Sequence, residues 1–389
     1  MNSGRTIFSQ VMDWLPLSGF RACVSRYRGD YRTRELTCLD QFYCMAFAQL
    51  SYRESLRDIE ACLRGSPTKL YHLGIRARIA RSTLADANER RDARIYADLA
   101  EMLMQTAQRL YVDDEWWRTL HRAVYAFDSS VIELSLKLFP WAEYKPHSSG
   151  VKLHALLNVT THIPGFVRIT RGKIHDVNVL DDLPIEPGAV YVLDRGYVDF
   201  ARLYRIAQRG AYFVTRPRKN ARFRRTASRE PDRDRGLMVD QTVRLVSFYP
   251  ARSYPDSLRR ICFVDLKTEK RLTFITNNFC WAGLTIAELY KSRWEVELFF
   301  RWIKQHLRIK AFYGNSENAV KTQLWIALSV YLILAIMKKE LRLPQSLHAI
   351  SQILSLNLFE KTPLQQLLRE STCTKKEERN HNSMPLFDF

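Results

Sequence analysis

The segment YKSRWEVELFFRWIKQHLRIK, which begins at Tyr290, carries the most informative pattern in the chain. At about 100° per residue, an α-helix places Tyr290, Arg293, Glu297 and Lys304 within roughly 60° of one another. Apolar side chains cover nearly all of the remaining circumference, which is typical of a buried helix. A polar stripe on such a helix needs a reason, because burying an unpaired charge is unfavourable.

Two explanations fit this stripe equally well. Arg293 and Glu297 are four residues apart and could form a structural salt-bridge ladder. Alternatively, the stripe is part of a functional site with Glu297 as its acidic member. Glu295 points about 140° away from Tyr290 and is the poorer candidate.

Two aspartates strengthen the functional explanation. Asp128 lies inside the apolar run AFDSS, and Asp194 ends the apolar run YVLDRG. Each alone is more often a turn or cap residue. Together with a helical glutamate in one α/β domain, they indicate a set of oxygen ligands for divalent cations such as Mg²⁺ or Mn²⁺.

The composition points to a polyanionic partner. The 389 residues include 60 Lys+Arg against 41 Asp+Glu, a net charge of +19. A basic protein of this kind gains affinity for nucleic acid through counterion release, although a merely soluble basic protein has the same composition. Seven cysteines without a CxxC pair argue against a zinc site. With no signal peptide, we expect a reducing cytoplasm, and the apolar run 324–337 is expected to be a core helix.

Residues 1–117 are predicted to be an all-helical N-terminal region that binds DNA. A short helix after Ser82 would present Asn88, Arg90 and Arg91, preceded by Arg76, Arg78 and Arg81. This segment could be the recognition helix of a helix-turn-helix-like unit. A solvated basic helix face is an equally good explanation.

The remaining chain is predicted to be α/β. Residues 118–218 alternate strands with helices and form the first part of a core. Residues 219–279 form a β-rich insertion whose first part, 219–235, is charged enough to be a loop. Residues 280–345 form the second part of the core, with one long helix from about Leu284, and 346–389 a C-terminal helix and polar tail.

With these residues in order, the chain resembles the DDE transposases of bacterial insertion sequences. The spacing Y-x2-R-x3-E-x6-K at Tyr290, Arg293, Glu297 and Lys304, after two aspartates, is similar to the signature of the IS4-type family. The runs GVKLH (150–154), DRGYVDF (194–200) and TNN (276–278) also look like that family. The resemblance covers roughly residues 35–345.

The resemblance implies an RNase H-like catalytic core with a β-rich insertion, preceded by a helical DNA-binding region. It implies that Asp128, Asp194 and Glu297 bind two Mg²⁺ ions, or Mn²⁺, and carry out DNA cleavage and strand transfer. The expected DNA-binding residues are Tyr290, Arg293, Lys304, Lys152, Arg90 and Arg91. For Lys152, and for His154 beside it, a strand side chain facing solvent is the alternative.

The resemblance further implies cut-and-paste transposition by a homodimer on terminal inverted repeats and target DNA, in the bacterial cytoplasm on the nucleoid. Two rival functions remain open at this point. Another RNase H-like nuclease would need three or four carboxylates but not the Tyr-Arg-Lys stripe. A domesticated, inactive DNA-binding protein would have no use for an intact acidic triad, which only costs stability when idle.

Overall fold

The computed structural model describes residues 4–65, 67–75, 79–111, 122–266, 269–307, 309 and 311–370. The chain divides into two compact units, each of which is discontinuous in sequence. The first contains the described residues of Met1–Tyr111, Ile132–Gly150 and Arg301–Phe389, and the second those of Val112–Val131 and Val151–Phe300. These units do not coincide with the predicted domain boundaries, since the residues from 301 onward group with the N-terminal helices.

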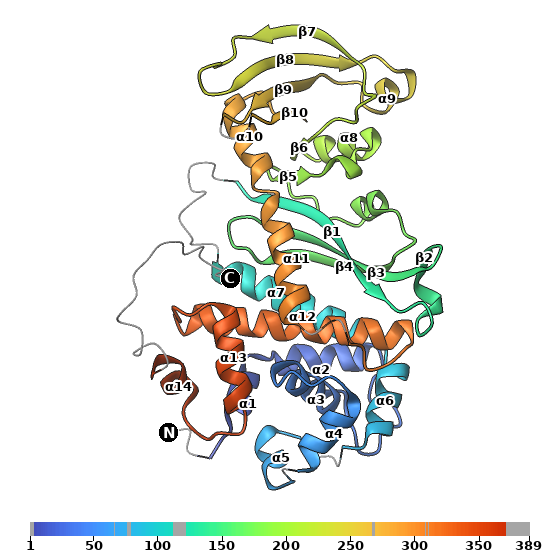
Figure 1. Cartoon of the computed structure of the whole chain (residues 1–389), viewed down its shortest axis with the longest axis vertical. Helices are drawn as coiled ribbons and strands as arrows, with labels where there is room; N and C mark the ends of the chain where they lie inside the picture. The colour runs from blue at the N-terminus through green and yellow to red at the C-terminus, as the bar shows by residue number, and fades with distance from the viewer. Residues whose placement is uncertain are drawn as a thin grey trace. The chain divides into compact units, whose positions relative to one another are not determined.

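The first unit is a helical bundle (Figure 1). Its centre is α12 (Glu317–Glu340), which packs along α7 (Arg94–Tyr111) and against α3 (Cys38–Leu50) and α6 (Arg81–Arg90). The other helices are α1 (Ile7–Val11), η1 (Met12–Trp14), α2 (Leu17–Arg26), α4 (Leu56–Arg64), α5 (Pro67–Leu73), α13 (Leu347–Asn357) and α14 (Leu364–Glu370). The expected all-helical N-terminal region is therefore confirmed for the described residues up to Tyr111.

Among the described helices, α12 alone is long and apolar enough to cross a membrane, with a mean hydropathy of 1.8 over its most apolar window. However, 94% of that window is buried inside the protein. Every residue from Leu324 to Met337 is buried, including Ser329, whose hydroxyl donates to the Trp325 carbonyl at 2.8 Å. The predicted core helix is confirmed.

The second unit contains most of a mixed β-sheet with the order β2-β3-β1-β5-β6-β10-β9-β8-β7, in which β4 pairs with β3; β2, the end of β1 and the beginning of β3 belong to the first unit. β1, β5 and β6 are parallel, whereas β2–β3, β3–β4, β6–β10, β10–β9, β9–β8 and β8–β7 are antiparallel pairs. The strands are β1 (Val124–Leu134), β2 (Glu143–Lys145), β3 (Ser148–Asn158), β4 (Pro164–Arg171), β5 (Val190–Leu193), β6 (Tyr212–Thr215), β7 (Phe223–Arg229), β8 (Leu237–Leu245), β9 (Leu258–Val264) and β10 (Arg271–Thr276).

Short helices connect these strands. They are η3 (Pro140–Ala142), η4 (Asp176–Asp181), η5 (Arg195–Tyr197), α8 (Phe200–Gln208), α9 (Phe248–Ser253) and α10 (Gly283–Lys291), with α11 (Trp294–His306) following α10. β5, in the parallel part of the sheet, is a continuous apolar strand, as expected for a strand that is covered on both faces. This mixed sheet with helices is the α/β, RNase H-like architecture that the sequence predicted.

Two local predictions are wrong. The segment 219–235 is not all loop, because Phe223–Arg229 forms β7, whose ladder with β8 makes it the edge strand of the sheet. The predicted long helix is two helices, α10 and α11, separated by a turn at Ser292 and Arg293. The Arg293 amide donates to the Tyr290 carbonyl, three residues back, and the Ser292 hydroxyl donates to Leu289 O at 2.7 Å. Such side-chain back-bonding bends helices.

Candidate active site

Asp128, within β1, and Asp194, directly after the end of β5, lie side by side. Phe127 on β1 is the register partner of Leu193 on the parallel neighbour β5, so the residue that follows each is an aspartate. The carboxyl ends of parallel strands are where α/β sheets place their ligand sites. Asp128 Oδ1 accepts the Ser129 amide at 2.8 Å. Asp194 caps η5, accepting the Gly196 amide at 3.4 Å.

The turn between α10 and α11 brings the helical stripe to these aspartates. Arg293 donates to Asp128 Oδ2 at 2.9 Å and to Glu297 Oε1 at 2.5 Å. The Tyr290 hydroxyl donates to Asp194 Oδ1 at 3.3 Å, and its ring packs against Phe274 of β10 with 4.8 Å between ring centroids. The structure therefore joins all three predicted carboxylates through two residues of the stripe.

The site is electrostatically coupled. Burial raises the pKa of Asp128 from its ordinary 3.8 to about 6, and the charges of Asp194 and Glu297 act in the same direction. The Ser129 amide and Arg293 oppose this shift. Burial by itself would lower the pKa of Arg293, but Glu297 and Asp128 raise it above its usual value. Asp128 therefore lies close enough to both other acids to be affected by their charges.

Comparison with known proteins assigns the family. The Transposase DDE domain family matches residues 120–333, a range that contains all three carboxylates. A putative transposase, y4zB, of Sinorhizobium fredii is 34% identical over 293 residues, covering 74% of this chain and 79% of the relative. The chain belongs to the DDE transposase family.

Two further relatives of this DDE transposase come from insertion sequences. A probable transposase for element IS5377 of Geobacillus stearothermophilus is 31% identical over 53% of this chain and 54% of its own length. A putative transposase for element IS4SA of a Synechocystis strain is 24% identical over 82% of this chain and 89% of its own length. Residues 3–76, in the helical unit, match a domain of unknown function, DUF4372.

The DDE transposase family implies dependence on a divalent metal, and the donor chemistry of the site fits one. Asp194 and Glu297 raise the pKa of Asp128, so a nearby cation would favour its charged form, and hard oxygen donors suit Mg²⁺ or Mn²⁺. Among the described residues, however, no three His, Cys, Asp or Glu side chains are arranged to hold one ion. In this arrangement the Arg293 guanidinium bridges Asp128 and Glu297.

The remaining predicted site residues lie elsewhere in the transposase. Lys304 is on α11, seven residues beyond Glu297, and is partly buried. Lys152 on β3 does not face solvent, since its Nζ donates to Ile174 O at 2.8 Å and lies 3.1 Å from Asp176 Oδ1. His154 is fully buried, contrary to the expected solvent-facing position, and burial lowers its pKa to about 4.

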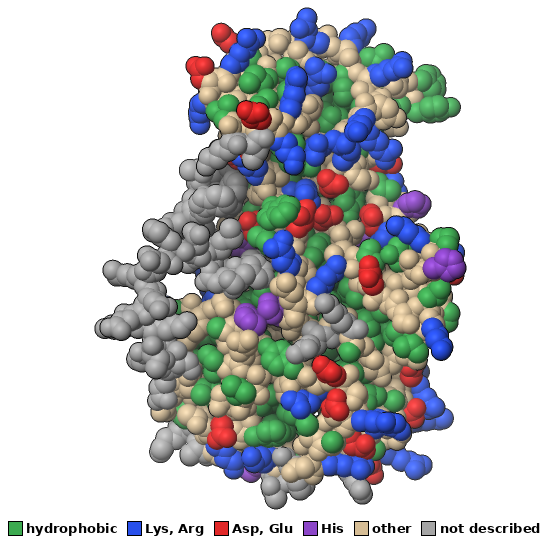
Figure 2. Space-filling view, in the orientation of Figure 1, with side chains coloured by type: hydrophobic (Ala, Val, Ile, Leu, Met, Phe, Trp, Pro, Cys, Tyr) green, Lys and Arg blue, Asp and Glu red, His purple; other side chains and the backbone are tan. Residues whose placement is uncertain are grey.

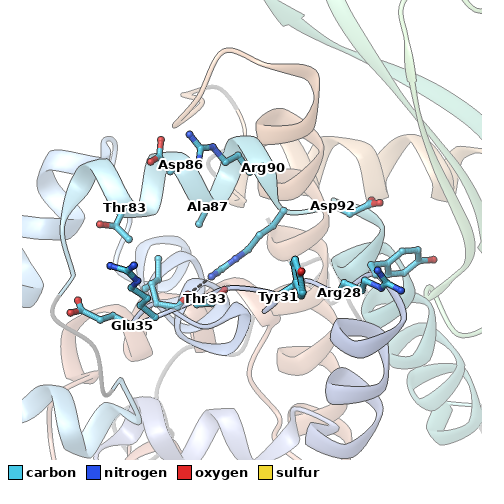
Figure 3. A pocket seen from close by; sticks show the side chains of 14 residues that line it. Arg28, Tyr31, Thr33, Glu35, Thr83, Asp86, Ala87, Arg90 and Asp92 are labelled. Carbon is cyan, nitrogen blue, oxygen red and sulfur yellow. Dashed lines mark hydrogen bonds between the residues drawn. The ribbon is translucent and has the colours of Figure 1, made fainter.

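The predicted recognition helix is α6, which borders a cavity of about 740 Å³ in the helical unit (Figure 3). Arg90 is exposed on its rim. Arg91 is held inside the unit, where it donates to Gln41 Oε1 and Thr37 O, both at 2.9 Å, and to Leu36 O. Asn88 is buried and accepts a hydrogen bond from Gln41, so α6 does not present it. The predicted basic residues Arg76 and Arg78 lie outside the described residues.

Sequence reasoning missed the contact between Tyr290 and Asp194. The helical wheel placed Tyr290 near Glu297, but it could not say which acid the hydroxyl would meet. It also missed Arg259 on β9, a buried side chain that pairs with Asp240 at 2.5 Å and donates to Trp281 O. This arginine ties β8 and β9 to the turn that leads into α10.

Proposed function

We propose that this protein is a cut-and-paste transposase that cleaves DNA at insertion-sequence ends and joins those ends to target DNA. The main support is the convergence of Asp128 on β1, Asp194 directly after β5 and Glu297 on α11 on one partly buried group of charges. The family assignment and the net charge of +19 agree with a DNA substrate.

Asp128, Asp194 and Glu297 would together hold two Mg²⁺ or Mn²⁺ ions. When bound, such ions supply activation of the attacking hydroxyl and stabilisation of the leaving oxygen at phosphorus. Before a cation can bind, Asp128 must be ionised, which its pKa of about 6 permits at neutral pH. Arg293 must also exchange its carboxylate partners for another anion.

Arg293, Tyr290 and Lys304 are proposed to hold the DNA backbone. The Arg293 guanidinium already donates through two nitrogens, and the same fork suits two oxygens of one phosphate. The Tyr290 hydroxyl can donate to a phosphate oxygen beside Asp194, and Lys304 supplies a point charge further along α11. These roles make Arg293 a carboxylate partner without DNA and a phosphate partner with it.

The proposed partners are double-stranded terminal inverted repeats and target DNA, bound by a homodimer on the nucleoid in the cytoplasm. Within the helical unit, the exposed Arg90 is the better candidate for a DNA contact. Arg91 and Lys152 have their donors engaged inside the protein, so contacts from these two to DNA would require rearrangement.

A transposition assay with purified protein tests this function. A plasmid carries a marker between the inverted repeats that flank the coding sequence, and a second plasmid serves as target. We expect Mg²⁺- or Mn²⁺-dependent excision and joining of the marker, and neither product from Asp194→Asn. Specific binding of the repeats without excision or joining would favour an inactive DNA-binding protein, and cutting without joining would favour a nuclease.

A further inference from the structure

The beginning of edge strand β7 carries a dense group of basic side chains. Among the eight residues 218–225, five are basic, none is acidic, and all five are exposed; we call Arg218, Lys219, Arg222, Arg224 and Arg225 the arginine edge. Figure 2 shows Lys and Arg side chains gathered over this part of the β-sheet. The other end of the β7–β8 hairpin differs, because Arg229 there lies 3.4 Å from Asp240 and acidic residues follow it.

One of these charges, Arg224, lies opposite a further arginine on the neighbouring strand. Arg224 on β7 and Arg244 on β8 are direct register partners, so their side chains lie on the same face, and both are exposed. Like charges at directly opposite positions destabilise an antiparallel pair. Such an arrangement is favourable when an anion bridges the two guanidinium groups.

Exposed aromatic rings follow immediately on α9. Phe248 and Tyr249 are 71% and 79% exposed, and their rings form an edge-to-face pair with 5.3 Å between centroids. The helix is anchored beneath them, since Ala251 packs against the core cluster and Tyr254 is buried against Tyr204. Val246, whose amide donates to Arg222 O at 3.2 Å, joins the rings to the arginine edge.

We propose that the arginine edge, Arg244 and the Phe248–Tyr249 pair bind a single-stranded DNA end. The arginines bind the phosphates, and the rings stack on unpaired bases. Basic grooves with projecting aromatic rings bind single strands in this way, because every base has a face on which a ring can stack. Inside a duplex those faces are already covered. The proposal rests on the proposed function only in taking DNA as the partner.

Fluorescence anisotropy with the full chain tests the proposal. The probes are a labelled oligothymidine of about 12 nucleotides and a duplex of similar length whose ends are closed by linkers without bases. The variants are Phe248→Ala/Tyr249→Ala and Arg224→Gln/Arg244→Gln. The matched controls are Tyr71→Ala, a ring 76% exposed on α5, and Arg209→Gln, an exposed arginine after α8.

We expect the aromatic double variant to lose about tenfold or more in affinity for oligothymidine and little for the closed duplex. The arginine double variant should lose affinity for both probes without a lower melting temperature, because it removes a like-charge pair. The controls should bind both probes as the wild type does. Oligothymidine affinities of both double variants that equal the wild-type value would overturn the proposal.

Cleavage of a duplex end, measured on the same preparations, separates this inference from the proposed function. If the double variants bind oligothymidine as the wild type does and cleavage requires Glu297, only the single-strand-binding surface is rejected and the proposed function stands. If the double variants lose oligothymidine binding but cleavage does not depend on Glu297, the result supports the single-strand-binding surface and rejects the proposed function.

Discussion

Arg293 occupies the position between two of the three acids. Its side chain is only 16% exposed, and it donates to both Asp128 and Glu297. In the absence of a metal ion, this guanidinium supplies the positive charge that the carboxylates need. Removing one partner of a fully buried ionic network is destabilising by about 3–5 kcal/mol, and this partly buried network should lose less.

Arg293→Ala should therefore lower the melting temperature strongly in EDTA and much less in excess Mg²⁺, because the cation replaces the lost charge. Differential scanning fluorimetry under both conditions measures the effect. Lys291→Ala is the control, since Lys291 is 55% exposed and its nitrogen lies 3.6 Å from Asp265; it should change little. An equal loss for Arg293→Ala in EDTA and in Mg²⁺ would argue against a cation at this site.

Asp128 gives the site a defined pH dependence. Its folded-state pKa of about 6 exceeds the ordinary 3.8, so burial of its charge opposes folding once the group ionises. The stabilising effect of the bound proton is complete below about pH 4 and is lost as the pH rises through 6. At one pKa unit per 1.4 kcal/mol, the loss is of the order of 3 kcal/mol.

Asp128→Asn should consequently raise the free energy of unfolding of metal-free protein above pH 6 and have little effect near pH 4. Denaturant titrations in EDTA at several pH values would show this crossover. A variant less stable than the wild type at pH 7.5 would mean that the hydrogen bond from Arg293 outweighs the burial of the charge.

At the level of single residues, the sequence identified the chemistry better than the contacts. The three acids and the stripe were visible because polar residues interrupt apolar patterns. The burial of Lys152 and His154 was not predictable, because the pattern of a strand does not show that η4 lies against these side chains. Asp176 of η4 lies 3.1 Å from the Lys152 nitrogen and 3.9 Å from His154 Nδ1.

Among the elements, α10 owes its position to a buried ion pair. Arg259 and Asp240, on β9 and β8, are both almost fully buried, and Arg259 also donates to Trp281 O just before the helix. Because α10 carries Tyr290, this pair indirectly fixes one side of the site. Gly283 at the start of α10 also packs closely against β8, since a Cβ at this position would lie 2.9 Å from the Leu237 side chain.

Arg259→Ala should lower the free energy of unfolding by about 3–5 kcal/mol, because Asp240 would remain buried without its main partner. The neighbouring Arg260→Ala is the matched control. Arg260 is partly exposed and donates to Gln241 at 2.9 Å, so its removal should cost about 1 kcal/mol. Chemical denaturation of both variants measures the difference, and similar losses would refute this anchoring role.

The elements that the sequence mispredicted share a physical cause. β7 is an edge strand with nearly every side chain exposed, so it lacks the apolar alternation by which a strand is recognised. The break between α10 and α11 is invisible because apolar residues continue through it. Only the hydrogen bonds of Ser292 and Arg293 reveal it. By contrast, β5 and α12 were predictable because burial dictates their composition.

For the whole molecule, the net charge of +19 predicts strongly salt-dependent DNA binding. A protein that makes 6–10 phosphate contacts loses about 10³–10⁵ in affinity between 50 and 200 mM salt. Anisotropy with a duplex of unrelated sequence over this range should give a linear fall of log affinity against log salt concentration. An affinity that does not change with salt would contradict phosphate binding as the main source of affinity.

We propose above all that Asp128, Asp194 and Glu297 form the catalytic site of a DNA-cutting enzyme. The most direct test of this proposal is cleavage of a labelled inverted-repeat end by Glu297→Gln and by Glu295→Gln, in Mg²⁺ or Mn²⁺. Glu295 lies on the same helix but faces His162, with 3.3 Å between Oε2 and Nδ1. We predict that Glu297→Gln binds the end without cutting it, whereas Glu295→Gln cuts. Undiminished cutting by Glu297→Gln would contradict the assignment.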